Sequence, residues 1–190
     1  NDVNKLIYSI TLTYKTFEFQ QFVQFVPQDL SQPTPAAPIT SQDFTNAYYE
    51  IYSYSRWIKM VNTAFQSAFA GLNALAVGGG DALPTTNAPF MEFNPTDYTA
   101  ILNADQAGYE QTLANPIKIF FNAPMFTLFS SFENEMLGYN VTNGKNNQIM
   151  VYSNNGTNLL TLPTYTAIQM YQEQSTTALW NPVSSLVFTS

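Results

Sequence analysis

The chain has 190 residues, of which 45% are hydrophobic and 10% are charged, and its net charge is −7. It contains no histidine and no cysteine, the side chains best suited to proton transfer, nucleophilic attack and metal ligation near neutral pH. Because it has no cluster of lysine or arginine and no long apolar window, we expect neither direct nucleic-acid contact nor membrane association. The length predicts a single domain over residues 1–190. The chain starts at Asn1 rather than methionine and ends inside a predicted strand, so we expect a fragment of a longer polypeptide.

The N-terminal residues predict two β-strands followed by a loop. Apolar and polar residues alternate over residues 6–14, which predicts a half-buried strand. Its apolar face consists of Leu6, Tyr8, Ile10, Leu12 and Tyr14. Residues 17–26 continue the alternation, and the four prolines within residues 27–38 predict an extended surface loop.

A long amphipathic helix is predicted over residues 45–76. Apolar residues recur at intervals of three and four from Ile51 to Leu75, while Lys59, Asn62 and Gln66 fall on the opposite side. The glycine run at residues 78–80 predicts the end of this helix. The spacing fits packing against the chain's own sheet, which we favour, and also packing against a helix of a partner.

Short β segments return after the glycine run. They are separated by proline, asparagine and glycine and lie at residues 90–93, 98–102, 117–121, 148–152, 159–162, 165–171 and 183–189. Asn155-Gly156 predicts a hairpin turn between residues 149–153 and 159–162, and Asn143-Gly144 predicts a second turn. Apolar spacing from Met125 to Phe132 predicts one short helix. These elements together predict a mainly β fold, an antiparallel β-sandwich with one long inserted helix around residues 45–76.

The acidic residues do not form a recognisable catalytic or metal-binding pattern. Glu133 and Glu135 are two positions apart in a predicted turn, whereas a glycosidase needs two carboxyl groups that face each other across a cleft. Asp97, Asp105 and Glu110 lack the spacing of a calcium-binding loop. The sequence therefore predicts no enzyme, no catalytic residue, no metal site and no cofactor site.

One group of aromatic residues is a candidate binding surface. Tyrosines and a tryptophan gather near the start of the predicted helix, at Tyr48, Tyr49, Tyr52 and Trp57. Aromatic side chains give a large contact area at low entropic cost, so these residues are candidates for an interface with a protein partner or for a sugar platform. At the start of a helix they are also common core residues.

These features together resemble a viral capsid protein. The resemblance rests on four features of the sequence. They are short alternating strands joined by Pro- and Asn-rich loops, a long helix inserted early, the absence of cysteine, and Trp180-Asn181-Pro182-Val183 before a final strand. It implies a jelly-roll fold of two four-stranded antiparallel sheets, in a virion. Capsid proteins of this type typically carry a basic arm that faces the genome, and this chain has none.

The resemblance implies a structural subunit that assembles through extensive interfaces with copies of itself or with related capsid subunits. The composition suits such a role, because Asn, Gln, Thr and Tyr can form hydrogen bonds across a buried interface, whereas unpaired charges are costly there. The alternative is a microbial module of the cell surface or extracellular space, such as a carbohydrate-binding β-sandwich. The size of the assembly separates the two functions, since a capsid subunit forms large closed particles, whereas a binding module stays small.

Overall fold

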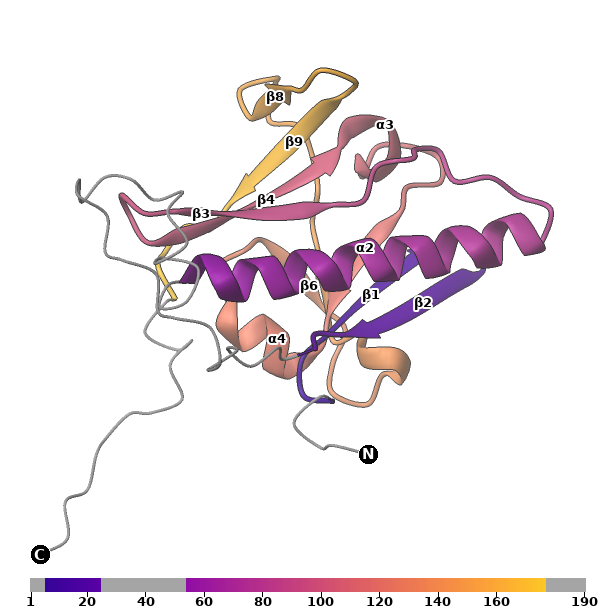
Figure 1. The fold of residues 1–190 in the computed structure, drawn as a ribbon, viewed down its shortest axis with the longest axis horizontal. Helices are drawn as coiled ribbons and strands as arrows, with labels where there is room; N and C mark the ends of the chain where they lie inside the picture. Colours follow the sequence, from indigo (N-terminus) through magenta and orange to yellow (C-terminus); the bar gives the residue numbers. More distant parts are fainter. Residues whose placement is uncertain (1–5, 25–53, 177–190) are drawn as a thin grey trace, which may run out of the picture.

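Two antiparallel sheets and one long helix enclose the core of the chain (Figure 1). The computed structural model describes residues 6–24 and 54–176, so the predicted loop at 27–38 and the predicted strand at 183–189 lie outside the described residues. Within these ranges one sheet has five strands and the other has four, and every strand pair is antiparallel. The predicted mainly β, antiparallel β-sandwich is confirmed, although the sheets have five and four strands rather than four each.

The five-stranded sheet has the order β2-β1-β5-β7-β6. Its strands are β1 (Ser9–Tyr14), β2 (Phe17–Phe22), β5 (Lys118–Phe121), β6 (Asn134–Met136) and β7 (Asn147–Ile149). Ile10 and Leu12 of β1 are fully buried toward the core, as their alternation predicts. Ser9 and Thr11 on the other face are also fully buried, so the prediction of a half-buried strand is wrong for this part of β1.

The four-stranded sheet has the order β3-β4-β9-β8. Its strands are β3 (Phe90–Asn94), β4 (Thr99–Asp105), β8 (Leu159–Thr161) and β9 (Thr166–Tyr171). Each overlaps a segment that the sequence predicts as β, although β3 and β4 extend beyond the predicted ends at residues 93 and 102. A short helix, α3 (Gln106–Tyr109), follows β4, and its N-cap Asp105 accepts a hydrogen bond from the backbone N–H of Ala107.

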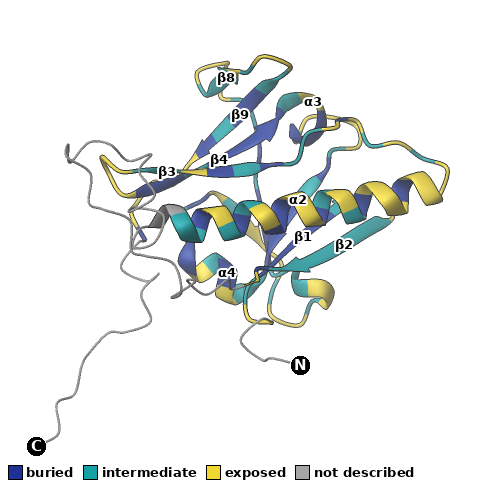
Figure 2. Cartoon of the chain, viewed as in Figure 1, coloured by how far each residue is buried: buried dark blue, intermediate teal, exposed yellow. Residues whose placement is uncertain are grey.

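Helix α2 (Tyr54–Gly78) closes the side of the sandwich where the edge strands β2 and β3 lie. In Figure 1 it runs across both sheets, and Figure 2 shows its buried residues on the side that faces them. The preferred prediction, that the helix packs on the chain's own sheets, is therefore confirmed. Residues 45–53 of the predicted helix lie outside the described residues. Its end agrees with the glycine run, where Gly80 has a φ of 78° and the Asp81 N–H bonds the Ala76 carbonyl at 2.9 Å.

Two positions of α2 differ from the prediction. Leu75 is 45% exposed, and Ala76 takes the buried position at the end of the apolar stripe. Asn62, predicted to be on the polar side, uses its amide to hold the edge of β3 that no described strand pairs. It accepts a hydrogen bond from the Met91 N–H at 2.7 Å and donates one to the Met91 carbonyl at 2.9 Å. Asn62 thus takes the place of a neighbouring strand at this sheet edge.

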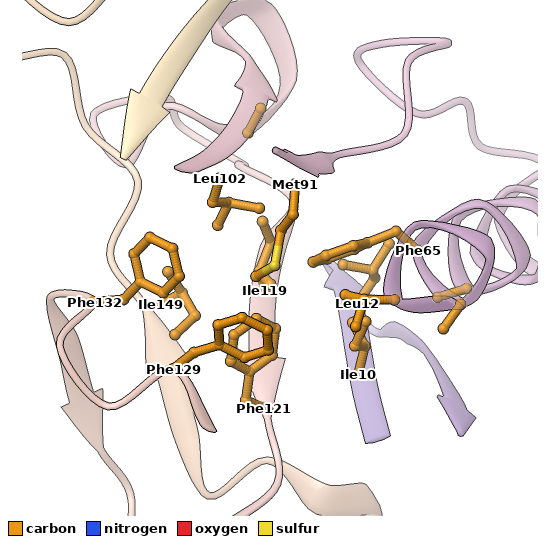
Figure 3. Packing of buried hydrophobic residues seen from close by; sticks show 14 of the residues in the cluster. Ile10, Leu12, Phe65, Met91, Leu102, Ile119, Phe121, Phe129, Phe132 and Ile149 are labelled. Carbon is orange, nitrogen blue, oxygen red and sulfur yellow. The ribbon is translucent and has the colours of Figure 1, made fainter. Parts of the chain in front are cut away.

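The core lies between the sheets and is closed by α2 (Figure 3). Phe65 of α2 meets Phe121 of β5 with ring centroids 6.2 Å apart, and Phe121 in turn meets Phe129 at 6.0 Å, with the rings of both pairs tilted against each other. Met91 and Leu102 come from the four-stranded sheet, so all three layers contribute to one cluster. The Phe19 ring of β2 lies against Gly71, where a Cβ would come within 2.5 Å of the ring.

Two predictions about the segments that connect the strands need correction. The predicted helix near Met125 is α4 (Ala123–Leu128), and it ends before the buried Phe129 and Phe132. Asn155 and Gly156 do form a turn, with φ values of 48° and 79°, but they do not join a hairpin. Both edges of β7 are already paired, by β5 and β6, so the chain crosses after β7 to the other sheet, where β8 pairs with β9.

Within the described residues, no helix is long and apolar enough to span a membrane.

Candidate assembly surface

The predicted aromatic site can be placed at one residue only. Tyr48, Tyr49 and Tyr52 lie outside the described residues. Trp57, in the first turn of α2, is half-buried and packs against the core, with its ring edge-to-face with Tyr8 at a centroid distance of 5.3 Å. Its Nε1 is buried and has no hydrogen-bond acceptor among the described residues. Contact between this aromatic group and a partner stays a prediction.

Glu133 and Glu135 are not in the predicted turn. Glu135 is part of β6, Glu133 immediately precedes this strand, and both side chains are exposed. The Glu133 carboxylate accepts a hydrogen bond from the Tyr152 hydroxyl, which raises the pKa of Tyr152 because the bond favours the protonated phenol. The Glu135 carboxylate forms no hydrogen bond or ion pair with the described residues.

The other acidic candidates, Asp97, Asp105 and Glu110, each form hydrogen bonds in a different part of the fold. Asp97 accepts hydrogen bonds from the N–H and the hydroxyl of Thr99, at 3.2 and 2.6 Å. Asp105 is 4% exposed and accepts from the Thr85 hydroxyl at 2.5 Å, and Glu110 accepts from a main-chain N–H. Among the residues of the described ranges, no three acidic side chains come together as metal ligands would.

The most exposed apolar segment in the described part of the chain lies at the edge of the five-stranded sheet. Met136 is 57% exposed, Leu137 43% and Tyr139 78%. Backbone bonds from Met150 N–H to Glu133 O and from Leu137 N–H to Asn146 O flank the β6–β7 ladder, at 3.0 and 2.8 Å. Because an antiparallel ladder alternates, the N–H and C=O groups of the intervening Asn134 and Met136 point away from β7. We call this edge, with Met136, Leu137 and Tyr139, the β6 surface.

The loop after β6, residues 137–146, folds back over the outer face of β1 and β2. Its Asn143 and Lys145 side chains both donate hydrogen bonds to the Glu18 carboxylate, and the Asn143 carbonyl accepts one from the Thr11 hydroxyl. The bond with Lys145 is the main reason that the pKa of Glu18 lies below its ordinary value. This loop explains why Ser9 and Thr11 are buried on the face that the sequence predicts to be exposed.

The predicted Asn143-Gly144 turn positions this loop. It forms the short 3₁₀ helix η2 (Thr142–Gly144), and both Asn143 and Gly144 have positive φ values, 54° and 65°. A Cβ at Gly144 would come within 2.7 Å of the Ser9 hydroxyl oxygen and of the Gln20 amide nitrogen. Glycine is therefore required here both by the backbone conformation and by the close approach to the sheet.

A hollow of about 370 Å³ lies beside the loop, on the outer face of the same sheet. Lys15, Lys118 and Lys145, three of the chain's six basic residues, line it together with Leu137 of the β6 surface. Lys15 pairs with Asp81 at 2.6 Å and Lys145 pairs with Glu18. Lys118 is half-buried, and its ammonium group forms no ion pair or hydrogen bond with the described residues.

Sequence reasoning missed both the β6 surface and the lysine hollow. The only local signal for β6 was Met136-Leu137 next to Tyr139, a short apolar run without alternation. The three lysines lie on β5, after β1 and after η2, far apart in the sequence.

The whole chain, residues 1–190, matches the family model of the Sputnik minor capsid protein V18/19. The chain belongs to this family. It is 42% identical over 78 residues to Sputnik virophage protein V18, a match that covers 38% of this chain and 47% of the relative. It is 36% identical over 94 residues to structural protein V19 of the same virophage, covering 47% of this chain and 43% of that protein.

The fold matches as well. A chain in the cryo-EM structure of the Sputnik virophage aligns with a TM-score of 0.65 and 33% identity, over 88% of this chain and 47% of that chain. These matches span about half the length of each relative. The predicted resemblance to a viral capsid protein is thus confirmed, and the minor capsid family places the chain among the structural proteins of a virion.

Proposed function

We propose that this minor capsid protein is a non-catalytic structural subunit that binds neighbouring capsid subunits through the β6 surface. The observation that carries the proposal is the coincidence of exposed apolar side chains with main-chain groups that no described strand pairs, on one sheet edge. The neighbours would be copies of this chain or related capsid subunits.

Physical chemistry supports an interface at this position. An exposed sheet edge can pair with a strand from another chain, and soluble proteins usually protect such edges with lysine, proline or a covering element. The β6 edge instead carries Met136 and is followed by Leu137 and Tyr139. Burying a Met, Leu or aromatic side chain contributes about 1.5–3 kcal/mol relative to leaving it exposed. Three such side chains with main-chain pairing would supply a strong centre for a larger interface.

The arrangement of the carboxylates supports a structural role over a catalytic one. Glu133, Asp105 and Glu110 each bond a separate partner in the fold. A general acid–base pair would need two carboxyl groups that converge on a substrate. With no histidine or cysteine in the chain, we expect no turnover of glycan, ester or peptide substrates between pH 4 and 8.

The test uses the full-length protein co-expressed with the other capsid proteins of its virus. Tyr139→Ser and Met136→Ser should each lower the amount of this protein in purified particles, and should weaken self-association in sedimentation velocity about tenfold or more, the equivalent of 1.4 kcal/mol. Tyr171→Ser is the matched control, because Tyr171 is 50% exposed on the other sheet. Normal incorporation and association of both β6 variants, with folding unchanged by circular dichroism, would rule out this surface.

A further inference from the structure

We propose that the lysine hollow is an inter-subunit carboxylate site, in which Lys118 of one copy of this chain binds Glu135 of a neighbouring copy. This inference rests on the proposed function, because it requires that copies meet at the β6 surface. It adds a specific charged contact to that interface.

Lys118 is held where a neighbour can reach it. It begins β5 and pairs across the sheet with Thr13 of β1, which in turn pairs with Glu18 of β2. Residues directly opposite each other in an antiparallel sheet project from the same face, so Lys118 and Thr13 share the outer face with Glu18. Glu18 is already bonded to Lys145 and Asn143. The half-buried Lys118 therefore lines the hollow with a positive charge that no described residue compensates.

The local charge indicates what kind of group the hollow accepts. The pairs Lys15–Asp81 and Lys145–Glu18 are each neutral, so the described residues give the hollow one net positive charge. One carboxylate would neutralise it. A nucleic acid is a poorer match, because its binding depends on several cationic contacts to successive phosphates. The chain itself supplies carboxylates in excess, with 13 acidic residues and 6 basic ones.

Glu135 is the carboxylate best placed to enter the hollow of a neighbour. It lies within β6 and is exposed, and its carboxylate has no hydrogen-bond or ion-pair partner among the described residues. Leu137, two residues later, lines the hollow and belongs to the β6 surface, so a copy that covers this surface also contacts one side of the hollow. Within one copy, β7 separates β6 from β5, and Glu135 and Lys118 do not bond.

The test is a charge-reversal cycle in the full-length protein. Lys118→Glu and Glu135→Lys are made singly and together, and self-association is measured by sedimentation velocity at about 50 mM and 500 mM NaCl. Each single variant should weaken association about tenfold or more at low salt, and the double variant should recover most of the loss, because it restores opposite charges at the contact. High salt should reduce these differences. Glu173→Lys, a reversal at another exposed glutamate, is the matched control and should have little effect.

The outcomes separate the two proposals. If either single reversal associates like the unmodified protein, or if the double variant shows no recovery, the Lys118–Glu135 contact is wrong. If this happens while Tyr139→Ser still weakens association, only the charged contact is overturned. If Tyr139→Ser and Met136→Ser also have no effect on association or incorporation, the β6 surface itself is wrong.

Discussion

Asn62 offers the most direct test of how the long helix joins the two sheets. Its amide forms two hydrogen bonds with the main chain of Met91, at 2.7 and 2.9 Å, on the edge of β3. Asn62→Ala removes both bonds and leaves an N–H and a C=O of Met91 without partners. A partner lost from a buried or partly buried polar group costs about 1–3 kcal/mol. Both Asn62 and these bonds are partly buried, so we expect a loss of about 2–4 kcal/mol in the free energy of unfolding.

The matched control is Asn73→Ala on the same helix. Asn73 is exposed and its side chain has no hydrogen-bond partner among the described residues, so this variant measures only the helix propensity gained by replacing Asn with Ala, about 0.5 kcal/mol. The assay is urea unfolding followed by circular dichroism, at protein concentrations where self-association is negligible. Equal unfolding free energies for the two variants, within about 0.5 kcal/mol, would refute the proposed role of Asn62 at the sheet edge.

Three further predictions address the core, the outer face and the pH dependence. Phe65→Ala should lower the free energy of unfolding by about 3–5 kcal/mol, because it opens a cavity against Phe121; a loss below about 1 kcal/mol in the same urea assay would contradict this packing. Gly144→Ala should destabilise the chain by at least about 1 kcal/mol, since its φ is 65° and its Cβ would meet Ser9; unchanged stability would show that the loop can shift. The pKa of Glu18 lies below its ordinary value of 4.5. The ionised Glu18 therefore contributes to the free energy of unfolding above that pH, and this contribution is lost as the pH falls through the lowered pKa. Lys145→Met should therefore show a smaller loss of stability during acid titration by circular dichroism than the unmodified protein, and an identical acid profile would refute the Lys145 contact.

The fold class and much of the core could be predicted from the sequence because they depend on local periodicity. Alternation places Ile10 and Leu12 on the inward face of β1, and intervals of three and four place Val61, Phe65 and Leu72 on the buried side of α2. Positive-φ turns at Asn143-Gly144 and Asn155-Gly156 were also recognisable, since these residue pairs adopt that conformation readily. The sequence also shows directly that the chain has no histidine or cysteine side chain for proton transfer, nucleophilic attack or metal ligation.

Only the tertiary structure determined which strands pair and what covers the outer face of the five-stranded sheet. Thr11 bonds Asn143, 132 positions away, and Lys145 bonds Glu18, 127 positions away. Such contacts leave no periodic signal, because they depend on how strands from distant parts of the chain are ordered in the sheet. The same ordering makes Glu135 part of an edge strand rather than a turn and sends the chain past Asn155-Gly156 into the other sheet. It also gathers three of the chain's six basic residues around one hollow. Local sequence thus determined which residues face inward, whereas the long-range pairing of strands determined which exposed residues lie together.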